Sequence, residues 1–252
     1  MNSTPVIDNA DSRSRHIDLE GTVNLRDAGG YETLDGRHTH WKTLWRSDSL
    51  HHLRPEGQKT LLDLGIRTII DLRFPSEIAQ SPSVFANSTA VRYHSIPLIP
   101  DTMPDNLPIP DDLVALYIGF LDDCQAALRN ILGTMLESGS APVLVHCTAG
   151  KDRTGMVIAL LLGAVGVPDA TVVADYALTE SYIGSLLPAL RRDAVRNGLD
   201  TVWYERMLDC QPEFMAKALE YLHKRYGSAE NYWRGLGFSA KQLDDLRMML
   251  VD

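Results

Sequence analysis

The chain has 252 residues, of which 44% are apolar and 23% are charged, and its formal net charge is −9. This length and composition are typical of a soluble globular protein that builds one sizeable core. The excess of acidic residues argues against a nucleic-acid partner, because a phosphate backbone attracts basic surfaces. We find no apolar run long enough for a membrane span and no secretory signal, so we expect neither.

The cysteines indicate a reducing compartment. Cys124, Cys147 and Cys210 are too few and too scattered for a disulfide framework. We therefore expect a cytoplasmic location, with export by a route that needs no signal peptide as the alternative. We expect Cys124 and Cys210 to be small buried apolar side chains, which is the usual place of a free cysteine.

Extended and helical patterns alternate along the first two thirds of the chain. Residues 1–18 are polar and without periodicity, and we expect a flexible N-terminal segment there. The predicted strands are 43–46, 67–72, 91–97 and 142–146, and the predicted helices between and after them are 55–64, 113–138 and 155–166. Five prolines between residues 97 and 110 predict a loop over 97–112.

From about residue 169 onward the pattern is helical only. Pro212 is a helix-start signal, Gly227 is a helix-stop signal, and Ser239 with Gln242 forms a capping box. This order predicts an α/β fold with a central, mostly parallel sheet flanked by helices. We expect one domain over 19–252, with extra C-terminal helices over about 169–252.

The most informative segment is Val-Leu-Val-His-Cys-Thr-Ala-Gly-Lys-Asp-Arg-Thr-Gly at 143–155. It lies between a predicted buried strand and a predicted buried helix, where α/β sheets bind their ligands. Successive backbone N–H groups in such a loop, with a helix N-terminus behind them, form a site for an anion. We therefore expect Thr148, Ala149, Gly150 and Lys151 to line a phosphate site.

The side chains of this loop predict nucleophilic catalysis. A thiolate is the reactive form of cysteine, and N–H donors and Arg153 would stabilise the thiolate of Cys147. The planar guanidinium of Arg153 matches two phosphate oxygens. Thr154 can donate its hydroxyl to the Cys147 sulfur when that sulfur leaves, and His146 is expected to brace the loop. These groups neutralise a phosphoryl group by themselves, so we expect no metal and no cofactor.

The loop resembles that of the protein tyrosine phosphatase superfamily, which has Cys, five residues, Arg, and then Ser or Thr. It is most similar to the atypical bacterial and fungal branch with His-Cys-x-x-Gly-Lys-Asp-Arg-Thr-Gly. The segments 24–30, 45–48 and 71–73 and the tail 226–250 also resemble that branch. The resemblance implies a cysteinyl-phosphate mechanism that acts on phosphotyrosine, often on phosphoserine and phosphothreonine, and in some members on phosphoinositides. Phosphate and vanadate are the expected site ligands.

The general acid has three candidates. In the atypical branch the acid lies inside the loop, which implies Asp152, and the negative substrate phosphate would favour its protonated form. Ordinary family members place the acid on an earlier loop, where Asp101 stands here. Asp71, at the end of a predicted strand, is the third candidate. Lys151 adds a positive charge that in related enzymes accompanies the use of inositol phosphates.

Two other functions compete with a phosphatase. One is a catalytically silent module that binds phosphorylated ligands, and the other is sulfur or arsenate chemistry on a similar cysteine loop. The complete set Cys147, Arg153, Thr154 and an aspartate favours the enzyme.

Overall fold

The computed structural model describes residues 14–99, 112–137 and 139–252. Within these ranges a five-stranded sheet has the order β1-β2-β5-β3-β4. β1 pairs with β2 antiparallel and the other neighbours are parallel. The strands are β1 (Arg26–Asp27), β2 (Leu44–Ser47), β3 (Thr68–Asp71), β4 (Arg92–Ser95) and β5 (Val143–His146). The predicted α/β class and mostly parallel sheet are confirmed.

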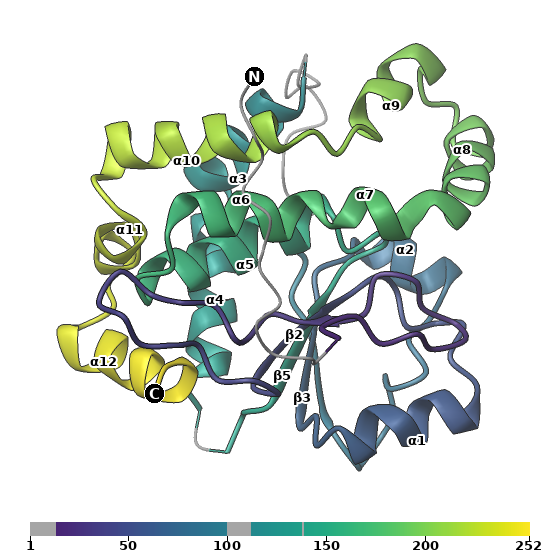
Figure 1. Ribbon diagram of the computed structural model, residues 1–252. Coiled ribbons are helices and arrows are strands. Elements are labelled where there is room, and N and C mark those ends of the chain that lie inside the picture. Colours follow the sequence, from purple (N-terminus) through teal and green to yellow (C-terminus); the bar gives the residue numbers. More distant parts are fainter. Residues whose placement is uncertain (1–13, 100–111, 138) are drawn as a thin grey trace.

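Helices cover both faces of this sheet, as the ribbon shows (Figure 1). The first five helices are α1 (Pro55–Asp63), α2 (Pro75–Gln80), α3 (Leu113–Asp123), α4 (Gln125–Met135) and α5 (Asp152–Ala164). The later elements are α6 (Asp169–Ala177), α7 (Thr179–Tyr182), the 3₁₀ turn η1 (Ile183–Ser185), α8 (Leu187–Arg196), α9 (Thr201–Met207), α10 (Pro212–Tyr226), α11 (Ala229–Gly235) and α12 (Ala240–Leu250). The region after residue 169 is therefore helical in the structure, as predicted.

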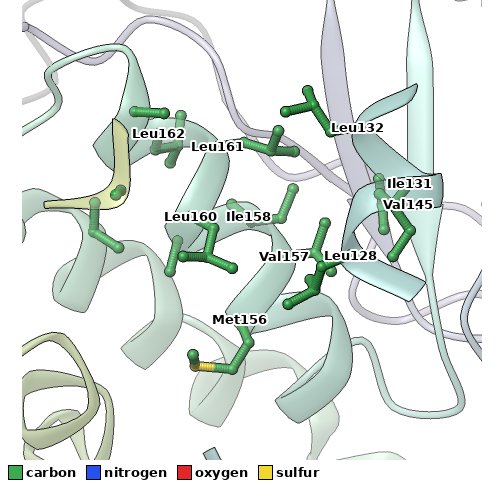
Figure 2. Packing of buried hydrophobic residues seen from close by; sticks show 14 of the residues in the cluster. Leu128, Ile131, Leu132, Val145, Met156, Val157, Ile158, Leu160, Leu161 and Leu162 are labelled. Carbon is green, nitrogen blue, oxygen red and sulfur yellow. The ribbon is translucent and has the colours of Figure 1, made fainter. Parts of the chain in front are cut away.

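The larger of two cores surrounds α5. This helix is apolar on nearly all sides and packs between the sheet and the C-terminal helices (Figure 2). In Figure 2, Val157 of α5 lies beside Leu128 of α4, and Ile131 of α4 lies beside Val145 of β5. The smaller core lies on the other face of the sheet and joins α1 to Trp45 and Leu144. β5 is therefore held from both faces, which fixes the point where the chain leaves it.

Three helices differ from the prediction. The pattern over 113–138 predicts one helix, but the chain turns at Cys124 (φ −102°, ψ 20°) and forms α3 and α4. α2 is absent from the prediction, although Pro75 and Glu77 occupy positions that favour a helix start. α5 begins at Asp152, three residues before its predicted start at Gly155, so Asp152, Arg153 and Thr154 belong to its first turn.

The N-terminal expectation falls partly outside the described residues, which begin at residue 14. The described part of 1–18 is bonded to the sheet edge: Ile17 donates its N–H to the Leu25 carbonyl at 3.0 Å, and the Arg15 guanidinium donates to Asp27 and Gly29 carbonyls. The proline-rich segment falls largely outside the described residues, because 100–111 are among those left out.

Candidate active site

The phosphate loop (147–153) connects β5 to α5. Gly150 has φ +66°, and a Cβ there would lie 2.4 Å from the Ser47 carbonyl oxygen. Any other residue would strain the backbone and collide with the chain after β2. The loop therefore curls tightly against 47–49, and Ser49 donates its N–H to the Thr148 carbonyl at 3.0 Å.

The carbonyl groups of the loop are engaged on its outer side. Asn24 Nδ2 donates to the carbonyls of Ala149 and Gly150 at 2.8 and 3.2 Å, and Arg46 Nη2 donates to Gly150 at 2.7 Å. The ring nitrogen Nδ1 of His146 lies 3.2 Å from the Cys147 carbonyl oxygen. His146 therefore braces the loop, as the sequence predicts, and burial lowers its pKa.

The backbone N–H groups of 148–153 differ from these carbonyls in their hydrogen bonding. None of them donates a hydrogen bond to any residue in the described ranges. Two of these residues, Asp152 and Arg153, also belong to the first turn of α5, whose N–H groups have no partner within the helix. Because the carbonyls are bonded outward, this row of free donors is available to an anion above Cys147.

Cys147 and Arg153 interact electrostatically. Cys147 is 2% exposed. Burial acts to lower the pKa of Arg153, but the Cys147 thiolate and Glu77 act more strongly and raise it above its usual range. The guanidinium of Arg153 is therefore charged, and it is close enough to the sulfur to stabilise a thiolate.

Glu77 of α2 holds the far end of that guanidinium. Its carboxylate accepts from Arg153 Nη1 at 2.6 Å and Nη2 at 3.0 Å, and it also accepts from the Thr148 hydroxyl. Arg153 Nη2 lies 3.1 Å from Thr148 Oγ1 as well. Since Glu77 uses only Nη1 and Nη2, the Nε side of the guanidinium stays available for phosphate oxygens.

Thr154 is fully buried, and its hydroxyl has no hydrogen-bond partner in the part of the chain that the structure describes. A buried hydroxyl without a partner costs free energy unless a ligand or an intermediate uses it. The predicted donation to the Cys147 sulfur stays a prediction.

Asp152 lies at the first position of α5 with its side chain 26% exposed. Its Oδ1 accepts from the hydroxyl of Tyr117 at 2.6 Å and lies 3.2 Å from Lys151 Nζ. Tyr117 in turn lies 2.7 Å from the hydroxyl of Tyr176. These contacts engage Oδ1, and the predicted role of Asp152 as general acid stays a prediction.

Lys151 is buried at 2% exposure and binds backbone carbonyls of the helical tail. Its Nζ donates to Met207 and Asp209, each at 2.6 Å. The ammonium thereby ties the loop to the end of α9, and its direct contact with a substrate stays a prediction.

Of the other acid candidates, Asp101 lies outside the described residues. Asp71 is fully buried and accepts from Arg73 Nε and Nη2 and from Tyr93, at 2.7 to 3.1 Å. Burial acts to raise its pKa, but His146 and Arg73 act more strongly and lower the pKa to about 2. Both carboxylate oxygens of Asp71 are therefore engaged in a fully buried cluster, whereas the Asp152 side chain is partly exposed beside the loop, and the choice of Asp152 as the acid stays a prediction.

Several residues of the site had no role in the prediction. Glu77, Tyr117 and Asp175 carried no signal in the sequence. Glu77 contacts the loop across 71 and 76 residues and Tyr117 across 35 residues, while Asp175 acts on it through Arg46. Asn24 and Arg46 belong to segments that marked the family resemblance, and this was the one available signal. Cys124 and Cys210 are buried, as expected, and burial raises the pKa of each thiol, to about 12 and about 11.

No helix in the described ranges has the length and apolar character needed to cross a membrane. No three His, Cys, Asp or Glu side chains within those ranges are grouped so as to hold a metal ion.

Comparisons with known proteins agree with this geometry. A model of the tyrosine phosphatase family matches residues 17–252. A tyrosine-protein phosphatase of Nostoc commune is 30% identical over 214 residues, which cover 81% of this chain and 73% of the relative. The triple specificity protein phosphatase PtpB of Mycobacterium tuberculosis is 28% identical over 93% of this chain and 98% of its own.

The similarity to a solved structure is lower than the similarity to these relatives. The core catalytic domain of the PP-IP phosphatase SIW14 of S. cerevisiae, in complex with citrate, covers 77% of this chain and 99% of its own, with 17% identity and a TM-score of 0.37. The family model spans the loop, the sheet and the helical tail together. This chain belongs to the tyrosine phosphatase family and is a cysteine-dependent phosphatase.

Proposed function

We propose that the chain hydrolyses phosphotyrosine, phosphoserine and phosphothreonine esters, and phosphoinositides as a further class, through a phosphoryl group carried on Cys147. The observation that supports it most is the row of N–H donors over 148–153, which have no acceptor among the described residues and follow Cys147 in the loop. Relatives named as a tyrosine phosphatase and as a triple specificity phosphatase support this substrate range.

In the first step the Cys147 thiolate attacks phosphorus and the bond between phosphorus and the ester oxygen breaks. The free N–H groups and the Nε side of Arg153 receive the three equatorial oxygens, whose charge they neutralise. Asp152 gives its Oδ2 proton to the leaving oxygen, which departs as an alcohol or phenol.

In the second step a water molecule attacks phosphorus and gives its proton to the Asp152 carboxylate. The bond between sulfur and phosphorus breaks, and the electron pair returns to Cys147. The Thr154 hydroxyl, which is buried and without a partner in the described ranges, donates to the departing sulfur. Inorganic phosphate then leaves and Asp152 is protonated for the next cycle.

The first test is the hydrolysis of p-nitrophenyl phosphate by wild type and by Cys147→Ser. We expect the variant to be inactive, while Cys124→Ser and Cys210→Ser serve as matched controls that keep activity, since both cysteines lie outside the loop. A Cys147→Ser variant as fast as wild type would reject the mechanism.

A silent binding module is the competing function. It predicts that wild type binds vanadate but releases no phosphate from any substrate. A panel of phosphotyrosine, phosphoserine and phosphothreonine peptides and phosphoinositide vesicles separates the two and ranks the substrates. Thiosulfate and arsenate assayed alongside test the sulfur and arsenate alternatives.

A further inference from the structure

We propose that Asn24 and Arg46, anchored by Asp175, are positioning residues that turn the carbonyls of the phosphate loop outward and so aim its N–H groups at the substrate phosphate. This rests on the proposed function, because it assigns how the same loop is prepared for an anion. None of the three residues lies within the loop, and Asp175 follows it on α6.

The argument begins with the geometry of a peptide unit. The C=O of one residue and the N–H of the next lie in one plane and point in opposite directions. Asn24 holds the Ala149 carbonyl, and Arg46 with Asn24 holds the Gly150 carbonyl. Fixing these two oxygens therefore fixes the directions of the Gly150 and Lys151 N–H groups.

The orientation of each positioning residue is itself determined. The Oδ1 of Asn24 accepts from the guanidinium of Arg26, so the Asn24 amide nitrogen must face the loop. Arg46 uses Nη1 for Asp175 Oδ2 at 2.5 Å and Nη2 for the Gly150 carbonyl. Asp175 Oδ1 accepts from the Tyr31 hydroxyl at 2.8 Å and lies 3.4 Å from Arg26 Nε.

The side chains of this network are buried. Asn24, Arg26, Arg46 and Asp175 are each at most 1% exposed. Burial and the charge of Arg46 lower the pKa of Arg26, but only to about 10, so the Arg26 guanidinium is charged at neutral pH. The two guanidinium groups contact the Asp175 carboxylate, and the buried Asp48 carboxylate accepts from the Asn24 backbone N–H beside them. These buried contacts fix the side chains of Asn24 and Arg46 against the loop carbonyls.

A purely structural role predicts something different. Buried polar networks contribute little net stability compared with apolar packing, and they are retained where they specify one arrangement. A structural role would change the melting temperature and leave the affinity of the folded loop for an anion as it is. The two roles are therefore separated by anion binding and by thiol reactivity.

The sharpest variant is Asn24→Asp, which keeps an oxygen for Arg26 but cannot donate to the Ala149 and Gly150 carbonyls. Arg46→Lys is the second variant, because one ammonium cannot reproduce the two-sided contact of a guanidinium. The matched control is Tyr232→Phe, which removes another buried hydrogen bond to a carbonyl, from Tyr232 to Leu121 at 2.6 Å.

Asn24→Asp and Arg46→Lys are called the loop variants, because they change contacts with the loop carbonyls. We expect each of them to weaken vanadate inhibition about tenfold or more, as the loss of one well-placed hydrogen bond does. We also expect the alkylation of Cys147 by iodoacetate to shift to higher pH, and KM to rise together with a fall in kcat. Tyr232→Phe is expected to lower only the melting temperature. Loop variants that melt earlier but bind vanadate and alkylate like wild type would overturn the proposal.

Deuterium exchange of the wild-type protein is a test that does not depend on whether a variant folds. We expect the amides of 148–153 to exchange with solvent deuterium in the free enzyme and to become protected when vanadate is added. Strong protection of the same amides without vanadate would show that they are already bonded, and it would also overturn the proposal. Deuterium exchange and the alkylation of Cys147 need no turnover, so a wild type that binds vanadate without turnover rejects the proposed function and leaves this proposal testable by these two readouts.

Discussion

Two buried charge clusters flank the phosphate loop, one at the end of β3 and one at the end of β2. At β3, Asp71 and Arg73 balance each other, and the cluster reaches the loop only through His146. At β2, Asp175 faces both Arg26 and Arg46, and the cluster holds loop carbonyls directly. The difference indicates that the β3 cluster fixes the end of the sheet, whereas the β2 cluster prepares the loop for an anion.

The largest expected effect tests the β3 cluster. Asp71→Asn leaves the buried Arg73 without its carboxylate, and breaking such a pair costs about 3–5 kcal/mol of unfolding free energy. Urea unfolding measures this loss. The kcat/KM of the folded fraction is expected to stay near wild type, since Asp71 lies behind the loop. A folded variant that fails on poor leaving groups alone would instead make Asp71 the general acid.

A pH titration of stability tests the β2 cluster. Burial acts to raise the pKa of Asp175, but Arg46 and Arg26 lower it to about 2. A carboxyl with a lower pKa in the folded chain contributes stability above its unfolded pKa of about 3.9 and loses it as pH falls toward 2.

We therefore expect this carboxyl to contribute roughly 2–3 kcal/mol near neutral pH, lost between about pH 4 and pH 2. The measurement is the unfolding free energy of wild type and Asp175→Asn at several pH values, where the gap between the two should narrow over that range. A constant gap would show that the ion pairs with Arg26 and Arg46 do not hold Asp175 ionised.

A smaller effect concerns Asp152, which neither cluster contacts. Tyr117→Phe removes the hydroxyl that holds Oδ1, and a hydrogen bond to a charged group contributes about 1.5–3 kcal/mol. We expect kcat to fall about tenfold for alkyl phosphates, whose leaving oxygen needs a proton, and little for p-nitrophenyl phosphate. Tyr221→Phe, which loses an exposed contact with Asp122, is the control. Equal losses on both substrates would contradict a role through the acid.

The smallest effect sets a baseline for the buried clusters. The pair Lys241–Asp245 is exposed on α12 at one-turn spacing. Asp245→Asn is expected to lower the unfolding free energy by about 0.3–0.5 kcal/mol and to leave activity unchanged. A loss as large as that of Asp71→Asn would remove the contrast between buried and exposed charge.

The site divides into a part that is local in sequence and a part that is not. Cys147, Asp152, Arg153 and Thr154 were predictable, because a strand, a turn and a helix start place them together within eight residues. The need for glycine at position 150 was also predictable, since a tight anion-binding loop brings the backbone into a left-handed conformation that favours glycine.

The remaining part depends on tertiary structure. Glu77 and Tyr117 reach the loop from α2 and α3, and no spacing rule connects them to it. The break at Cys124 has neither proline nor glycine to signal it. Lys151 has a side chain that suggests substrate contact, but the carbonyls of Met207 and Asp209 hold its ammonium, which only the folded tail reveals.

The most direct test of the central claim is to trap the phosphoryl group on Cys147. Wild type and Asp152→Asn would be mixed with p-nitrophenyl phosphate, quenched in acid within milliseconds, and analysed by mass spectrometry of the peptide that contains residue 147. We expect that peptide to gain one phosphoryl group, with more of it in Asp152→Asn because the second step needs the carboxylate as a base. Phosphate release with no phosphorylated Cys147 in either protein would contradict the mechanism.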